Sequence, residues 1–171
     1  HTYDNDGDGA ADEGAVYAYD AAGNQSYRAD DLDGDGVADR TSTYTWDALG
    51  YPAGQVDDFD GDGAPDRIWT WTHDAAGDLL DAEEDADGDG AVDTTDTYTY
   101  DAGGRELTHG WDSDGDGVVD GTSTYVYDAA GLPLTHDTTT DGVRTDSEVW
   151  TYDAAGLLLT YSHDEDMDGA S

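Results

Sequence analysis

Residues 31–39 read Asp-Leu-Asp-Gly-Asp-Gly-Val-Ala-Asp, the pattern DxDGDGxxD, and this acidic stretch decides how the chain is organised. Five complete copies, each 27 residues after the one before, begin at Asp4, Asp31, Asp58, Asp85 and Asp112. Four carboxylates within nine residues repel one another, because like charges at short range interact unfavourably. The pattern therefore predicts a bound cation in each copy, and the fixed period predicts a tandem repeat.

The spacing of the oxygen donors matches the first part of an EF-hand calcium loop, with side chains at positions 1, 3 and 5, a backbone carbonyl at 7 and an acid at 9. Gly36 stands at position 6, where the chain must turn sharply. Position 12, where an EF-hand has a bidentate Glu, holds Ala15, Ser42, Trp69, Asp96 and Ser123. No helix pattern flanks any copy, so these loops are not EF-hands.

We predict about five calcium ions, each bound by the four acids of one copy and by the carbonyl at position 7. A partial copy at the C-terminal end adds three further acids. The predicted ligands are Asp4, Asp6, Asp8, Ala10, Asp12, Asp31, Asp33, Asp35, Val37, Asp39, Asp58, Asp60, Asp62, Ala64, Asp66, Asp85, Asp87, Asp89, Ala91, Asp93, Asp112, Asp114, Asp116, Val118, Asp120, Asp164, Asp166 and Asp168.

Composition narrows the classes of partner. The 171 residues include 43 acids against 5 basic residues, and the formal net charge is −38. Nucleic acid and membrane insertion are not expected, because the former needs basic patches and no stretch is long enough to span a bilayer. The chain has no Cys, so disulfides cannot stabilise it, whereas a bound calcium ion can. Loops of modest calcium affinity suit the extracellular space or the cell surface.

A second motif recurs six times in phase with the acidic copies. It begins at Tyr17, Tyr44, Trp71, Tyr98, Tyr125 and Trp150 and reads aromatic-x-aromatic-Asp-x-x-Gly, with His73 at the second aromatic position of the third copy. This motif resembles the YD repeats of RHS-type proteins. The acidic copies resemble the calcium loops of thrombospondin type 3 repeats and of integrin-type propeller blades, in which the Asp at position 9 closes the site. The resemblance implies an all-β repeat protein that binds calcium.

Each 27-residue unit is expected to contain two strands and two turns. Residues 94–100 alternate aromatic or acidic side chains with Thr at a period of two, which is typical of a strand with one apolar and one polar face. The Asp-x-x-Gly that follows favours a tight reversal. The predicted fold is an antiparallel β-hairpin meander forming an extended or spiralling ribbon; the alternative is a β-solenoid with one coil per repeat.

The sixth unit departs from the repeat. It is 25 residues long, and in its acidic stretch, Asp137 to Asp146, two of the four acids are lost or displaced. Counting back from Asp141 places position 1 on Asp137, and Arg144 adds a positive charge, so we expect no ion here. Residues 1–171 are expected to form a single array of about six units, with a partial loop from Asp164, cut from a longer array.

No catalytic constellation is present among these near-identical units, and we do not expect an enzyme. The regular repeats favour a calcium-stabilised extracellular stalk or filament subunit that self-associates end to end or side by side. The alternatives are a ligand-binding adhesin segment or part of an RHS-like enclosing shell.

Overall fold

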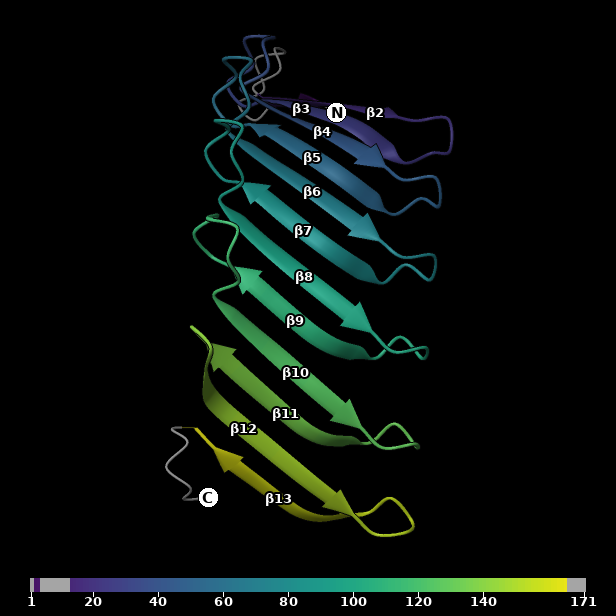
Figure 1. Cartoon of the computed structure of the whole chain (residues 1–171). Helices are drawn as coiled ribbons and strands as arrows, with labels where there is room; N and C mark the ends of the chain where they lie inside the picture. The colour runs from purple at the N-terminus through teal and green to yellow at the C-terminus, as the bar shows by residue number, and fades with distance from the viewer. Residues whose placement is uncertain (1, 4–12, 166–171) are drawn as a thin grey trace. The chain divides into compact units, whose positions relative to one another are not determined.

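The computed structural model describes residues 2–3 and 13–165, and in these ranges every regular element is a β-strand (Figure 1). The strands are β1 (Thr2–Tyr3), β2 (Glu13–Tyr19), β3 (Gln25–Asp31), β4 (Arg40–Trp46), β5 (Pro52–Asp58), β6 (Arg67–His73), β7 (Leu79–Asp85), β8 (Thr94–Tyr100), β9 (Glu106–Asp112), β10 (Gly121–Tyr127), β11 (Pro133–Thr140), β12 (Val143–Tyr152) and β13 (Leu158–Asp164). They follow one another in chain order in one open sheet.

The chain divides into two compact units. The first comprises residues 1–77 and 82–93, and the second comprises residues 78–81 and 94–171. Both repeat the same hairpin, in which a strand ends at the YD motif, reverses, and returns toward the next acidic stretch.

Strand pairing confirms the antiparallel meander and shows that the solenoid alternative is wrong. In the second unit Tyr98 of β8 lies opposite His109 of β9, and His109 lies opposite Ser123 of β10. Tyr125, the equivalent of Tyr98 one repeat later, is therefore two strands away and two residues further along its strand. In the first unit, Tyr44, Gln55 and Trp69 show the same stagger of two residues per repeat.

The sheet has two different faces, as the alternation of side chains predicts. In β6, Trp69, Trp71 and His73 are half-buried, whereas Thr70 and Thr72 are exposed. The aromatic rings pack on one another across and along the strands: Tyr98 stacks on His109 with centroids 4.5 Å apart, and Trp69 lies parallel to Trp71 at 5.8 Å. These contacts replace the packing that a second layer would supply.

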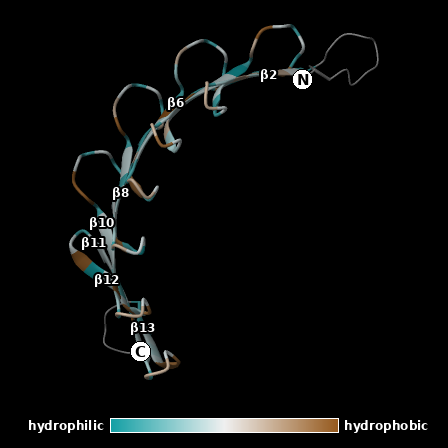
Figure 2. Cartoon of the chain, turned by 90° about the vertical axis from the view of Figure 1, so that its right-hand side faces the viewer, coloured by the Kyte–Doolittle hydropathy of each residue, from teal (hydrophilic) through white to brown (hydrophobic). Residues whose placement is uncertain are grey.

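The described part of the sheet has no hydrophobic core beneath it. Ala82 is the one buried hydrophobic residue of the described ranges, and no side chain there is fully buried. In the edge-on view each unit is a single layer of strands (Figure 2). Since hydrophobic burial is the dominant favourable term in most folds, this sheet must depend more than usual on hydrogen bonds, ring contacts and ligands.

The Asp-x-x-Gly segments form the predicted tight turns. Asp20 Oδ1 accepts hydrogen bonds from the backbone N–H groups of Ala22 and Asn24, both at 2.8 Å, and the N–H of Gly23 donates to the Asp20 carbonyl at 3.1 Å. The same bonds recur in other copies, for example at Asp128. These Asp residues therefore shape turns, as expected.

A β-bulge accompanies these turns, which the periodicity did not predict. In β8 and β9 the register shifts between Thr99 and Tyr100, so that Leu107 has no partner across the ladder. Leu134 and Leu159 occupy the corresponding positions in β11 and β13. A bulge increases the local twist and redirects the strand.

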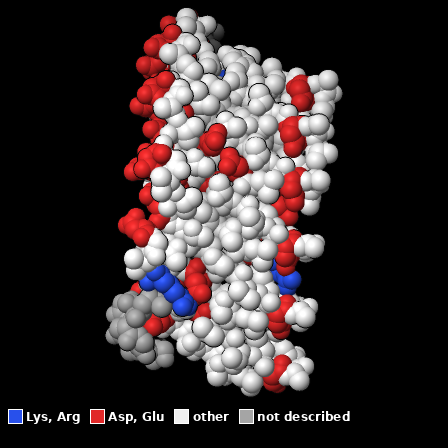
Figure 3. Space-filling view, viewed as in Figure 1, with Lys and Arg blue, Asp and Glu red and all other residues white. Residues whose placement is uncertain are grey.

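Successive turns contact one another through the residue that follows the turn Gly. The Tyr51 ring covers Gly77, and its hydroxyl donates to the Ala76 carbonyl at 3.3 Å. Arg105 covers Gly131 in the same way in the second unit. The turns at Gly77 and Gly131 thus each pack on the preceding turn, at the end of the strands opposite the acidic loops. Acidic side chains gather along both of these edges (Figure 3).

One turn carboxylate, that of Asp101, should resist protonation. The pKa of Asp101 is lowered, chiefly by the hydrogen bond from the Arg105 side chain and then by the Arg105 backbone N–H. Because the folded pKa is depressed, the stabilisation is present above the unfolded pKa and is lost as the pH falls through the folded value. A carboxyl-detected NMR titration should show Asp101 titrating below an ordinary Asp.

Arg105→Gln should raise the pKa of Asp101 toward its usual value. Asp47, whose pKa is lowered mainly by the Tyr51 backbone N–H, should keep its depressed value in the same variant and serves as the control. An unchanged Asp101 titration in the variant would contradict the role given to the guanidinium.

Candidate metal sites

The acidic stretches connect the second strand of one hairpin to the first strand of the next. The described ones are loop 2 (Asp31–Asp39), loop 3 (Asp58–Asp66), loop 4 (Asp85–Asp93) and loop 5 (Asp112–Asp120). Position 1 is the last residue of a strand, and position 10 is the first residue of the following strand. At the base of loop 2 the Asp39 N–H donates to the Asp30 carbonyl at 2.8 Å, which closes the loop.

Backbone N–H groups already hold the loop carboxylates in place. Asp31 Oδ1 accepts from the Gly34 N–H at 2.7 Å, and Oδ2 accepts from the Gly36 N–H at 3.0 Å. Asp39 Oδ2 accepts from the Leu32 N–H at 2.6 Å. Loops 3, 4 and 5 repeat these three bonds. The loop shape thus arises from the Asp residues themselves.

The two glycines make this wrapping feasible. Gly34 and Gly36 have φ values of 74° and 87°, in the left-handed region that other residues adopt only with strain. Their N–H groups point at one carboxylate as a result, which confirms the predicted turn at position 6 and gives position 4 the same role.

The folded loops bring acidic oxygens together. One oxygen from each member of a triad lies within 4.8 Å of the other two, and each triad contains position 1 and position 3. The triads are Asp31, Asp33 and Asp39; Asp58, Asp60 and Asp62; Asp85, Asp87 and Asp93; and Asp112, Asp114 and Asp120. These groups could hold a metal ion, since three oxygens at this separation fit around one cation.

In loops 3, 4 and 5 the position-1 carboxylate is the most buried member of its triad. Asp58, Asp85 and Asp112 are only 7%, 6% and 7% exposed, respectively. Burying a charge is costly unless it is paired or coordinates a metal, and two N–H bonds offset only part of that cost. The burial therefore favours a cation beside each of these side chains.

Some predicted ligands lie outside the triads. Asp35 of loop 2 belongs to none of them, and its Oδ1 accepts from the Val37 N–H at 2.7 Å. Asp66 of loop 3 likewise stands apart from its triad and accepts from the Phe59 N–H. Asp164 ends β13. The loop that starts at Asp4, and Asp166 with Asp168, lie outside the described residues.

A buried acid next to position 1 was missed from the sequence. Asp57 is 4% exposed, accepts from the Ser42 hydroxyl at 2.6 Å and accepts from Gln55 Nε2 at 2.8 Å. Its equivalent one repeat later, Glu84, pairs with Arg67 at 2.6 Å. The sequence could have revealed these acids through the period-two alternation, which places the residue before position 1 on the aromatic face. They therefore belong to the sheet and not to the loops.

Neighbouring loops pack directly on each other in the first unit. A Cβ added to Gly61, at position 4 of loop 3, would lie 2.7 Å from the Ala38 carbonyl oxygen of loop 2. At Gly88 of loop 4 the corresponding distance to the Pro65 carbonyl oxygen is 1.9 Å. Position 4 is therefore a contact point between repeats as well as a turn residue.

The sixth connection differs from its predicted alignment. Thr122 pairs with Thr139, as Thr95 pairs with Asp112 one repeat earlier, so position 1 falls on Thr139 and not on Asp137. Counting back from Asp141 was wrong, because the two-residue deletion lies inside the loop. Position 9 remains Thr145, and Arg144 contacts Asp137 and Ser147.

The contact between loops can be separated from glycine's backbone role. Gly88 and Gly90 both have positive φ values, 72° and 91°, but a Cβ at Gly90 would meet nothing within 4 Å. Ala at either position carries similar backbone strain, and only Gly88→Ala collides with loop 3. We expect Gly88→Ala to lower the free energy of unfolding by about 1–3 kcal/mol more than Gly90→Ala, the usual cost of overpacking.

Urea unfolding of both variants at saturating calcium measures this difference. Equal losses in the two variants would show that loop 4 does not depend on loop 3.

Comparison with known proteins identifies the fold and no family. No protein-family model and no curated protein matches the sequence. The crystal structure of TcdB2-TccC3 without its hypervariable C-terminal region matches 86% of the chain with a TM-score of 0.59 and 19% identity. A second structure, TcdB2-TccC3-TEV, matches 88% with a TM-score of 0.46 and 16% identity. A porin-like protein from Bacteroides uniformis matches 87% with a TM-score of 0.39 and 12% identity.

The chain spans only 7% of the first of these chains and 9% of the second. The similarity to the first structure is consistent with an RHS-like fold. Within the described residues, no helix is long and apolar enough to cross a membrane.

Proposed function

We propose that this chain is a calcium-stabilised extracellular structural repeat protein that serves as a stalk or filament subunit. One observation carries the proposal: within residues 2–3 and 13–165, a sheet with a single buried hydrophobic residue presents four convergent carboxylate triads at regular intervals. A fold without a core needs another source of stability, and metal binding to sites that exist only in the folded state supplies it.

Calcium is the ion that suits these donors best. The donors are all oxygens, which hard cations prefer, and calcium accepts six to eight of them at about 2.3–2.6 Å in flexible geometry. Two oxygens on opposite sides of such an ion are about 4.8 Å apart, and the triad oxygens lie within this separation of one another. Asp at positions 1, 3, 5 and 9 and the carbonyl at position 7 supply enough donors once the remaining side chains turn inward.

The repeats contribute structure, and we propose no catalysis. Self-association end to end or side by side would extend the array. The second candidate is part of an RHS-like shell, which the fold similarity to TcdB2-TccC3 favours. An adhesin segment is the third. A low-resolution image of the particle separates a straight stalk from a closed shell.

Removing calcium should unfold much of the sheet. Without the ion each loop holds four like charges on a chain of net charge −38. We expect chelation to abolish most of the β signal in circular dichroism, and calcium to restore it at about 0.1–1 mM, the range of extracellular modules. Magnesium should restore it poorly, because it demands near-ideal octahedral geometry. A spectrum unchanged by chelator would contradict a structural role for calcium.

Stoichiometry tests the sites one at a time. Asp33→Asn removes a position-3 carboxylate from loop 2 and should lower the number of calcium ions bound by one, measured by equilibrium dialysis at the lowest free calcium that fills the sites of the unmodified chain. Asp141→Asn removes an acid from the sixth connection and should leave the number unchanged. Equal effects of the two variants would show that the loop pattern does not define the sites.

A further inference from the structure

The sixth connection is a two-residue β-turn. Asp141 and Gly142 have φ values of 52° and 72°, and Thr140 pairs with Val143 across them. Positive φ at both central residues defines the type I′ turn that matches the twist of a hairpin, and Asp-Gly is among its preferred sequences. The strands that it joins, β11 and β12, are the longest in the described chain, at 8 and 10 residues.

The charge of this connection is also different. Residues 139–145 contain one acid, Asp141, and one base, Arg144, for a net charge of zero. Loop 5 has four acids over its nine residues and no base, for a net charge of −4. The repulsion that demands a cation elsewhere is therefore absent here.

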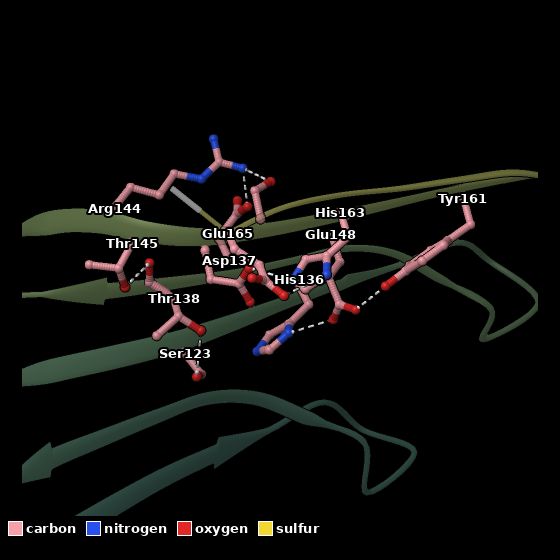
Figure 4. A network of polar contacts seen from close by, with 12 residues as sticks. Ser123, His136, Asp137, Thr138, Arg144, Thr145, Glu148, Tyr161, His163 and Glu165 are labelled. Atoms are coloured by element: carbon pink, nitrogen blue, oxygen red, sulfur yellow. Dashed lines mark hydrogen bonds and ion pairs between the residues drawn. The ribbon is translucent and has the colours of Figure 1, made fainter. Parts of the chain in front are cut away.

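Arg144 supplies a cation that is part of the chain. It pairs with Asp137 of β11 and contacts the Ser147 hydroxyl of its own strand (Figure 4). Ser147 is only 7% exposed. A guanidinium stays protonated at all physiological pH values, so this bridge across the hairpin needs nothing from solution.

Further polar contacts between side chains link the strands next to this hairpin. His136 Nδ1 lies 3.0 Å from Glu148 Oε2, and the Tyr161 hydroxyl donates to Glu148 Oε1 at 2.6 Å (Figure 4). The Ser123 and Thr138 hydroxyls are 3.3 Å apart. These contacts join β10, β11, β12 and β13.

The result is a run of four strands without an acidic loop inside it. From Gly121 to Asp164 the three connections are two YD turns and the Asp141–Gly142 turn. Elsewhere in the described chain acidic loops leave only pairs of strands between them, such as β4 and β5. An isolated two-stranded hairpin is marginally stable at best, whereas three or more strands can stand alone.

We infer that β10 to β13 form a cation-independent anchor, a segment that stays folded when the acidic loops are empty and from which the other hairpins refold as calcium returns. The inference rests on the proposed function for the behaviour of the other loops. Its own basis is the short turn, the neutral connection and the Arg144 bridge.

Hydrogen exchange of the full chain, followed by mass spectrometry with and without chelator, tests the anchor. In chelator we expect peptides from residues 121–164 to exchange at least about tenfold more slowly than peptides from residues 40–58 and 94–112, since regions of different local stability open separately. In calcium all of these peptides should be protected.

Two variants locate the cause. Arg144→Gln should lose protection of residues 121–164 in chelator, whereas Arg28→Gln, which removes the same charge from an ion pair with Asp30 in the first unit, should not. Replacing residues 139–145 by the loop 5 sequence, residues 112–120, should make the segment sensitive to chelator.

The outcomes separate the two proposals. If chelator opens residues 121–164 as fast as the other hairpins, the anchor is overturned and the calcium role stands. If chelator opens no peptide, the calcium role is overturned; the anchor is then supported only if Arg144→Gln opens residues 121–164, and is overturned if it does not.

Discussion

Repulsion among carboxylates is the constraint on which the rest of this structure depends. Each acidic loop crowds four negative charges into nine residues, and the fold meets them with backbone N–H groups. Asp58, for example, accepts two such bonds at 2.7 and 2.9 Å while it is nearly buried. The N–H groups can point inward only because glycines at positions 4 and 6 adopt positive φ. The N–H groups leave the negative charge of the loop unbalanced, and a bound divalent cation, as proposed above, would balance it.

The absence of a core makes this constraint decisive. In an ordinary domain a strained loop is held by hydrophobic packing elsewhere, but here the described sheet buries only Ala82 among its apolar residues. Stability must therefore come from contacts between neighbouring repeats: the ladder, the ring stacks, the loop contact at Gly88 and the turn contact at Gly77. Such an array behaves approximately as a one-dimensional chain of coupled units. In such an array, a unit with a neutral connection, such as the one containing Arg144, also stabilises the units next to it.

The aromatic face illustrates how polar groups are accommodated in a single layer. Asp57 lies among Ser42 and Gln55, and Glu84 pairs with Arg67, whose guanidinium lies 4.9 Å from the centre of the Trp69 ring. In the second unit His109 takes a similar place, stacked on Tyr98 and 2.7 Å from Asp96. In the last two pairs an aromatic ring packs against one member: Trp69 against Arg67, and Tyr98 against His109.

The sequence by itself determined the repeat, the strands, the turns and the two-faced sheet, because these depend on local rules: period-two alternation, the Asp-x-x-Gly reversal and glycine at sharp bends. It also identified the acidic loops, since their ligand spacing lies within nine consecutive residues. Only the tertiary structure decided the features that arise between strands. The stagger of two residues per repeat, the bulge at Leu107, the burial of Asp57 and the packing of Gly88 on Pro65 depend on residues in other strands and loops. The sixth connection shows the difference most directly. Alignment of the sequence on Asp141 places position 1 at Asp137, whereas the strand register places it at Thr139. Hydrogen-bonded pairing, and not spacing along the chain, decides which residues are equivalent.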